Sequence, residues 1–138
     1  MRKVRGKNTK PEIAVRKMLF AAGYRFRLHR RDLPGSPDIV LPGRQKIVFV
    51  HGCFWHAHRC SYGRAPKTRK KFWEAKRARN VRRDGHVTRA LRRLGWEVVV
   101  IWECQLRGDH QFVLRQLTTF LGGPTSVTSF DRTRDPDR

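Results

Sequence analysis

Four residues whose side chains commonly bind transition metals lie in one short segment, and a fifth follows much later in the chain. They are Cys53, His56, His58 and Cys60, with Cys104 remote in sequence. Zinc prefers four soft or borderline ligands in a tetrahedron, and thiolates combined with imidazole suit it. Cys53, His58 and Cys60 supply three ligands from one loop, and Cys104 follows an apolar strand, where it could supply the fourth. This Cys₃His set predicts a structural zinc site without an open position. The alternative is three buried cysteines beside unrelated histidines.

A single aspartate indicates a different metal chemistry. Asp38 follows a proline and opens one of two apolar runs joined by a Pro-Gly turn, a pattern typical of a β-hairpin. Folding that hairpin brings Asp38 near Val50 and His51. Metal-dependent nucleases place a carboxylate beside the end of a neighbouring strand to hold Mg²⁺ against a scissile phosphate. The alternative is that Asp38 only caps the start of its strand.

Further groups could converge on this aspartate: Glu12, His51, His56 and Asp84. Each also has a purely structural interpretation. Glu12 could complete a helix capping box with Thr9, and Asp84 could simply interrupt a helix. The two histidines could be satisfied structural residues.

Aromatic side chains are interleaved with positive charge in two places. Residues 64–93 hold 13 Lys and Arg, with Trp73 among them, and Phe54 and Trp55 lie inside the predicted zinc loop. Exposed aromatic rings among basic residues can stack on bases or wedge between them. Packing of Phe54, Trp55 and Trp73 in the core is an equal alternative.

The overall charge suggests the class of partner. The chain has 32 Lys and Arg against 11 acidic residues in 138, a formal net charge of +21. Self-repulsion at this charge disfavours the compact state, so a polyanionic partner is the natural compensation. Nucleic acid is the first candidate and an anionic membrane surface the second. A basic protein without such a partner is the remaining alternative.

Composition also bears on the compartment. No stretch reaches the ~18 consecutive apolar residues of a membrane span. The basic N-terminus lacks the apolar segment of a secretory signal. Three cysteines are an odd number and too few for a disulfide framework, which favours a reducing cytosol. We therefore expect a cytoplasmic protein with no membrane partner.

The elements that must position these residues follow from periodicity and punctuation. We expect helices over 9–23, 68–94 and 110–121, and strands over 24–29, 38–41, 46–50 and 96–102. The triplet Asp84-Gly85-His86 favours a break in the long basic helix. The apolar, β-branched run 96–102 predicts a buried central strand. The order predicts one α/β domain over 9–121, a mixed central sheet flanked by helices. A basic arm would precede it at 1–8 and a disordered tail would follow at 122–138.

Several blocks of the chain resemble one known family. Residues 51–60 (His-Gly-Cys-Phe-Trp-His-Ala-His-Arg-Cys) resemble the signature loop of the Vsr endonucleases. Further blocks match in the same order, at 33–38, 80–84 and 94–104, so that the resemblance covers roughly residues 5–121. It implies an enzyme that nicks one strand beside a T:G mismatch, the first step of very-short-patch repair. It also implies a restriction-endonuclease-like core, although the second half of the usual PD…(D/E)xK set is absent.

The resemblance assigns a role to each residue of the predicted catalytic set. Asp38 would bind Mg²⁺ through its carboxylate, with the backbone carbonyl of Val50 as a second ligand, and Glu12 would hold the water shell of the metal. His56 would be the general base in place of the missing lysine. The orienting groups of that histidine and of the bound waters would be His51 and Asp84.

The resemblance also assigns the remaining residues. The structural zinc ligands would be Cys53, His58, Cys60 and Cys104. The residues that intercalate next to the mismatch would be Phe54, Trp55 and Trp73. The partner would be double-stranded DNA with a T:G mismatch, bound by a monomer in the bacterial cytoplasm at the nucleoid. Two alternatives stay open: a nuclease of this fold with another mismatch or structure specificity, and a non-catalytic, zinc-stabilised nucleic-acid-binding module.

Overall fold

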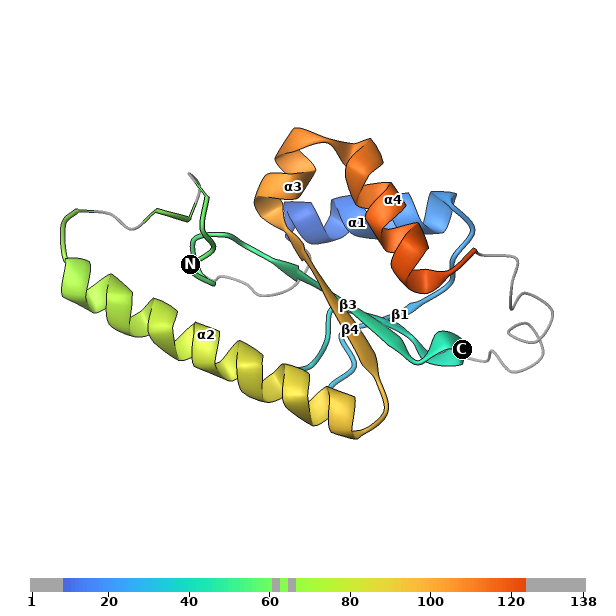
Figure 1. Cartoon of the computed structure of the whole chain (residues 1–138), viewed down its shortest axis with the longest axis horizontal. Coiled ribbons are helices and arrows are strands. Elements are labelled where there is room, and N and C mark those ends of the chain that lie inside the picture. Colours follow the sequence, from blue (N-terminus) through green and yellow to red (C-terminus); the bar gives the residue numbers. More distant parts are fainter. Residues whose placement is uncertain (1–8, 61–62, 65–66, 124–138) are drawn as a thin grey trace.

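The computed structural model describes residues 9–60, 63–64 and 67–123, so the predicted arm and nearly all of the predicted tail lie outside the described residues. The elements are α1 (Lys10–Ala21), β1 (Arg27–Leu28), β2 (Ile39–Leu41), η1 (Pro42–Arg44), β3 (Lys46–His51), α2 (Lys70–Arg93), β4 (Glu97–Trp102), α3 (Glu103–Gly108) and α4 (His110–Leu121). Helices cover both faces of a mixed sheet, so the predicted α/β architecture is confirmed (Figure 1). No helix in these ranges is long and apolar enough to cross a membrane.

Two hydrophobic clusters hold the three layers together. The larger one joins α1, α3 and α4 to one face of the sheet and includes the buried Tyr24. The smaller one joins α2 to the opposite face through Leu91. Along β3, Val48 belongs to the larger cluster, while Ile47 and Phe49 belong to the smaller one. This alternation is expected of a strand covered on both sides.

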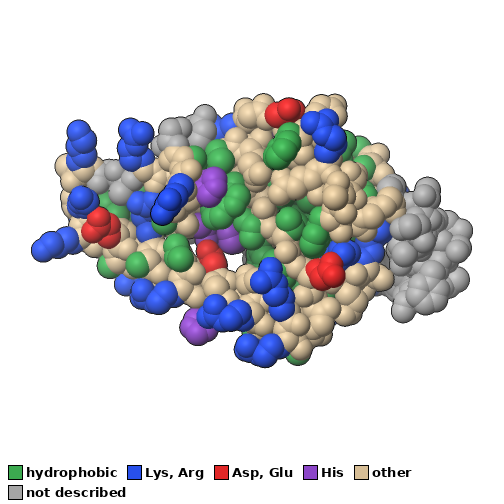
Figure 2. Space-filling model, in the orientation of Figure 1, with side chains coloured by type: hydrophobic (Ala, Val, Ile, Leu, Met, Phe, Trp, Pro, Cys, Tyr) green, Lys and Arg blue, Asp and Glu red, His purple; other side chains and the backbone are tan. Residues whose placement is uncertain are grey.

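The long helix α2 runs without a break, so the predicted interruption near Asp84 is wrong. Gly85 is helical, and a glycine inside a helix costs only about 1 kcal/mol relative to alanine. The anchoring of the C-terminal half by the fully buried Leu91 offsets such a cost. The Asp84 carboxylate bonds a histidine instead of competing for the helix backbone. Figure 2 shows Lys and Arg side chains along the outside of this helix.

Helix α1 begins and ends where the sequence predicted. The Thr9 side chain accepts a hydrogen bond from the Glu12 N–H at 3.3 Å and caps the first turn. Val15 and Leu19 are fully buried against the sheet. Gly23 follows the last turn with a φ of 101°, a left-handed conformation that glycine adopts without strain.

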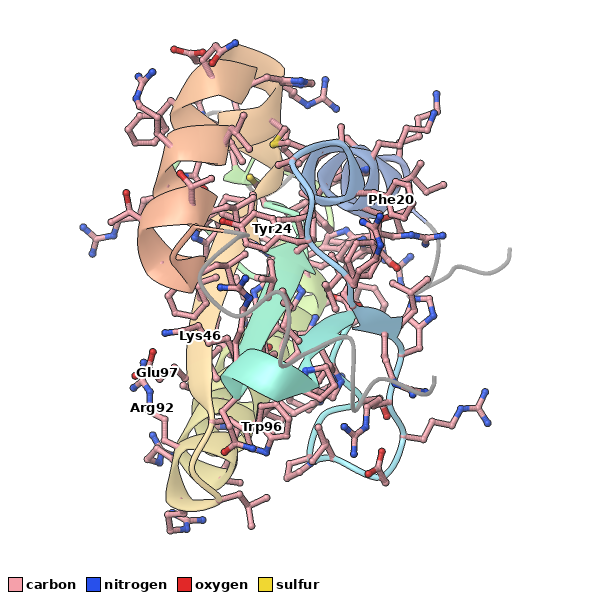
Figure 3. All side chains as sticks on the ribbon, turned by 90° about the vertical axis from the view of Figure 1, so that its right-hand side faces the viewer. Phe20, Tyr24, Lys46, Arg92, Trp96 and Glu97 are labelled. Carbon is pink, nitrogen blue, oxygen red and sulfur yellow. The ribbon has the colours of Figure 1, made fainter. Side chains whose placement is uncertain are left out.

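The register of the sheet places the ends of β3 and β4 side by side. β2 and β3 form the predicted antiparallel hairpin, and β3 runs parallel to β4 from the Lys46–Glu97 pair to the His51–Trp102 pair. The side chains of the first pair form an ion pair and project together from the sheet (Figure 3). At the other end, the segments that follow the two strands start next to each other. Polar side chains in those segments can therefore meet.

Strand β4 is not the central strand that its composition predicted. Among the described strands it lies at the edge of the sheet and pairs with β3 alone. Ile101 is fully buried, whereas Val98, Val99 and Val100 are half-buried. The strand is apolar because both of its faces are covered: Val99 packs against the larger cluster, and Val98 and Val100 against the smaller one. The continuously apolar sequence of β4 therefore indicates that both faces of the strand are covered, and not that the strand is central in the sheet.

Two shorter elements also differ from the prediction. β1 covers two residues of the expected 24–29, although the alternation holds, with Tyr24 and Phe26 inward between exposed arginines. The helix α3 was not predicted. It starts directly at the end of β4, where the Gln105 side chain accepts the N–H of Trp102 at 2.8 Å.

Candidate active site and metal centre

Asp38 precedes β2 and lies beside the end of β3, as the hairpin predicted. Its Oδ2 accepts a hydrogen bond from the Val50 N–H at 3.1 Å, so the contact with Val50 runs through the amide. Burial raises the pKa of Asp38 to about 6, and the Val50 N–H acts against this. The charges of Glu12, His29 and His56 also reach this carboxyl, Glu12 raising its pKa and the histidines lowering it. A half-buried carboxyl with a raised pKa favours a nearby cation once it is ionised.

Glu12 extends from α1 toward the same place. It is 1% exposed, and its Oε2 lies 2.6 Å from His29 Nε2 and 3.1 Å from an Arg16 nitrogen. The N–H of Glu12 does bond Thr9, but its carboxylate points to these two bases. Ligating atoms of Glu12, His29 and Asp38 all lie within 4.8 Å of one another. His29 was not predicted as a site residue. Its place at the end of an alternating strand, shortly before the Pro-Asp pair, is the signal that could have found it.

His56 and Asp84 form a pair in which one nitrogen of the imidazole is engaged. His56 Nδ1 lies 2.5 Å from Asp84 Oδ2. The His51 ring stacks on the His56 ring, with centroids 3.8 Å apart and planes 3° apart. Burial lowers the pKa of His51 to about 4, and the neighbouring His56 contributes, so His51 is neutral at neutral pH. Its Nδ1 is buried without a hydrogen-bond partner among the described residues.

Three different elements converge on this histidine pair. His51 ends β3, Asp84 belongs to α2, and His56 lies in the irregular segment predicted between them. The N–H of His56 bonds the Gly52 carbonyl at 3.3 Å, which turns the chain back toward the strand end. The Asn80 side chain of α2 donates to the Trp55 carbonyl at 2.9 Å and holds the segment against the helix.

All five predicted catalytic side chains therefore fall into two adjoining groups. The first holds Glu12 and Asp38 with the added His29, and the second holds His51, His56 and Asp84. The first group offers the oxygen ligands that a hard divalent cation prefers. The second offers an imidazole with one ring nitrogen left for proton transfer. The orphaned nitrogen of His51 indicates that a polar group completes the site.

The four predicted zinc ligands also come together, on the other side of the His56 segment. Ligating atoms of Cys53, His58, Cys60 and Cys104 lie within 4.8 Å of one another. The Cys104 N–H donates to Cys53 Sγ at 3.3 Å, and Cys104 Sγ lies 3.5 Å from His58 Nδ1. The parallel register of β3 and β4 explains the meeting, because Cys53 and Cys104 each lie two residues beyond its last pair, His51 and Trp102.

The donor set fits a soft or borderline metal ion. Burial raises the pKa of Cys53 to about 12 and also raises that of Cys104. None of the three cysteines forms a disulfide. Thiols held this close together without a disulfide are stabilised most by a cation that binds their thiolate forms. The His58 ring is fixed by stacking on Trp102, with centroids 4.0 Å apart and planes 11° apart.

The three predicted intercalating residues form one aromatic cluster. Ring centroids lie 4.9 Å apart for Phe54 and Trp55, 5.3 Å for Phe54 and Trp73, and 5.7 Å for the two tryptophans. Trp55 is 46% exposed, so the cluster is not part of the core. Phe72 extends it, 43% exposed and 5.0 Å from Trp73, and was not predicted. Arg77 braces the cluster by donating to the Phe54 carbonyl at 2.8 Å.

Comparisons with known proteins point in one direction. A family profile described as DNA mismatch endonuclease Vsr matches residues 1–62. The type II nicking enzyme V.XorIIP of Xanthomonas oryzae pv. oryzae is 55% identical over 106 residues, 77% of this chain and 78% of that enzyme. The DNA mismatch endonuclease Vsr of Escherichia coli is 39% identical over 118 residues, 86% of this chain and 76% of that enzyme. The type II nicking enzyme V.NmeAIP of Neisseria meningitidis is 44% identical over 107 residues, which cover 78% of this chain and 76% of that enzyme.

Proposed function

The chain belongs to the Vsr family of DNA mismatch endonucleases and related nicking enzymes, and from this premise we propose that it nicks one strand of duplex DNA beside a T:G mismatch in a Mg²⁺-dependent reaction. The observation that carries the proposal is the meeting of the half-buried Asp38 with the His56–Asp84 pair at the end of β3. We take residues 9–121 as the catalytic domain, acting as a monomer on DNA.

Asp38 and Val50 would hold the catalytic Mg²⁺, through the carboxylate and the backbone carbonyl. Glu12 would face the water shell of the ion from the buried side. When bound, Mg²⁺ would stabilise the negative charge that develops on the scissile phosphate. The raised pKa of Asp38 supports this role, because burial disfavours the ionised carboxylate and a bound cation would offset that cost.

His56 would take the proton of the attacking water. Its Nδ1 faces Asp84 at 2.5 Å, which fixes the tautomer and leaves Nε2 to accept the proton. Asp84 would also stabilise the imidazolium that forms. His51 is neutral and stacked on His56, so it holds the ring plane without adding a competing charge.

The cysteine and histidine cluster would hold a structural Zn²⁺. Its four protein ligands would be Cys53, His58, Cys60 and Cys104, whose ligating atoms lie within 4.8 Å of one another. A site filled by four side chains has no place for substrate, so its contribution is to shape and stability. His58 is two residues from His56, so fixing one histidine also limits the positions of the other.

The aromatic cluster would provide the contact with the mismatch. Phe54, Trp55 and Trp73 carry a large apolar surface, part of it exposed, beside a strongly basic helix. Inserting such rings unstacks a base step, which costs least where pairing is already weak. A T:G pair is such a place, and this supports mismatch selectivity. Ring insertion tolerates many sequences, so another mismatch as target is the second candidate.

The test is a nicking assay with labelled duplexes of one sequence that differ at one base pair. The wild-type protein is incubated with T:G, T:A and A:C duplexes, with and without Mg²⁺. We expect one nick, on the strand with the mismatched thymine, only with Mg²⁺ and only in the T:G duplex. Equal cutting of T:G and A:C would support the second candidate. Tight binding of all duplexes with no cutting would leave a nucleic-acid-binding module.

A further inference from the structure

We propose that His29 is a positioning residue of this active site, whose imidazole holds the Glu12 carboxylate in place beside Asp38. His29 lies between β1 and β2, Glu12 belongs to α1, and Asp38 opens the hairpin. The role deepens the Mg²⁺-dependent reaction proposed above and depends on it. His29 would touch neither the phosphate nor the attacking water.

The side-chain contact is short and sheltered. His29 Nε2 lies 2.6 Å from Glu12 Oε2, and the two side chains are 18% and 2% exposed. A buried carboxylate needs such donors, because leaving it without them costs several kcal/mol. Arg16 also reaches the same oxygen from one turn further along α1, at 3.1 Å. His29 also has a ring nitrogen within 4.8 Å of a carboxylate oxygen of Asp38.

The backbone of His29 is tied to the other carboxylate residue. Its N–H donates to the Asp38 carbonyl at 3.1 Å, and its φ is 49°. This left-handed conformation is uncommon outside glycine, although Asn, Asp and His adopt it more often than other residues. One residue thus bonds Asp38 through its main chain and Glu12 through its side chain. A shift of His29 would move both carboxylates relative to each other.

The charges of the three residues explain why a link through His29 would matter. Glu12 raises the pKa of Asp38, and His29 lowers it. Two carboxylates close together in a sheltered site repel each other unless a donor or cation lies between them. Because the imidazole is bonded to Glu12 and lies close to Asp38, Glu12 can stay near the metal position without displacing Asp38. The geometry suits a pair that shares one ion and its waters.

The test compares two substitutions of His29. Which of them is the more damaging depends on whether His29 holds the Glu12 carboxylate or only fixes the backbone conformation. The amide nitrogen of glutamine is separated from Cα by as many bonds as Nε2 of histidine, so His29→Gln can still reach Glu12. Asparagine is one bond shorter but accepts the left-handed backbone well. A role in backbone conformation alone predicts that His29→Asn is the milder change. The proposed role predicts that His29→Gln is milder.

The first readout is Mn²⁺ binding by the zinc-loaded protein without DNA, followed by water-proton relaxation. The second is the Mg²⁺ concentration that gives half-maximal nicking of the T:G duplex. We expect His29→Asn to weaken both by about 10–100-fold, as is usual when a group that orients a ligand is lost, and His29→Gln to stay close to wild type. The exposed His110→Leu is the matched control and should change neither. Thermal melting verifies that each variant folds.

Two results would overturn the inference while leaving the proposed function intact. One is wild-type metal dependence in both His29 variants, and the other is a milder effect of asparagine than of glutamine. If the wild-type protein neither binds Mn²⁺ nor nicks T:G duplex with Mg²⁺, the proposed function fails first, and the role of His29 fails with it.

Discussion

Two histidines of one loop, His58 and His56, lie in regions that differ in how completely protein side chains surround them. His58 lies among three cysteines, a set of four ligands that the chain closes by itself. His56 is held through one ring nitrogen by Asp84 and stacked on His51, and its other nitrogen has no hydrogen-bond partner among the described residues. The closed region can stabilise but not react, while the half-open region can transfer a proton. Under the proposed function, two residues of spacing would separate a structural histidine, His58, from a reactive one, His56.

Breaking the closed region should have the largest effect. In Cys104→Ser the thiolate that links α3 to the loop is lost, and structural zinc ions contribute on the order of 10 kcal/mol in small zinc domains. We expect loss of bound zinc, a lower melting temperature and no detectable nicking. Zinc content and thermal melting measure this. The exposed Arg107→Ala, in the same helix, is the control that should keep zinc and activity. A zinc-free Cys104→Ser protein with normal melting would show that the cluster is not a structural metal site.

Removing His56 should have a smaller effect than removing Cys104, and that effect should be confined to the rate of the reaction. His56→Ala loses the proton acceptor, and general-base groups contribute about 10²–10⁴-fold to rate. Single-turnover nicking should fall by that factor, while zinc content and melting temperature stay at wild-type values. His86→Ala, an exposed histidine of α2, is the matched control. Loss of zinc in His56→Ala would contradict the division between the two regions.

The pH dependence of stability should give the smallest effect. The pKa of Asp38 is about 6 in the folded chain, against an ordinary value of 3.8 for an aspartate carboxyl. A raised carboxyl pKa favours the protonated folded form, so its stabilisation is fully present below about pH 4 and is lost as pH rises through about 6. The loss is up to about 3 kcal/mol. Without added Mg²⁺, wild-type melting should therefore decline across this window relative to Asp38→Asn.

Added Mg²⁺ should reverse that trend, because it binds the ionised carboxylate. We expect Mg²⁺ affinity to rise with pH up to about 6 and to level off above it. An affinity that is flat between pH 4.5 and pH 7 (roughly a unit and a half below to a unit above the Asp38 pKa) would exclude Asp38 as the main ligand. The same titration of Asp38→Asn is the control.

Much of both regions could be predicted because the deciding relations are local or follow from strand register. Cys53, His58 and Cys60 lie within eight positions of one another in a loop, and Cys104 follows a strand that runs parallel to the one before the loop. The hairpin turn alone brings Asp38 to the end of β3. These are short-range constraints that residue types and spacing express directly.

The parts that were missed depend on tertiary packing. His29 reaches Glu12 only because α1 packs across the sheet and the backbone of His29 turns left-handed. The continuity of α2 through Gly85 depends on anchoring by the core. The edge position of β4 depends on which faces the helices cover, and composition cannot tell that from a central position.

The most direct test of the central claim is the rate at which Asp38→Ala nicks a T:G duplex in Mg²⁺ under single-turnover conditions. The matched control is Asp32→Ala, an exposed aspartate in the same connection that pairs with Arg30. We expect a loss of at least about 10³-fold for Asp38→Ala, with zinc content unchanged, and a wild-type rate for the control. Nicking by zinc-loaded Asp38→Ala within about tenfold of wild type would contradict the central claim, because a change that small is about 1.4 kcal/mol, far less than a metal ligand contributes.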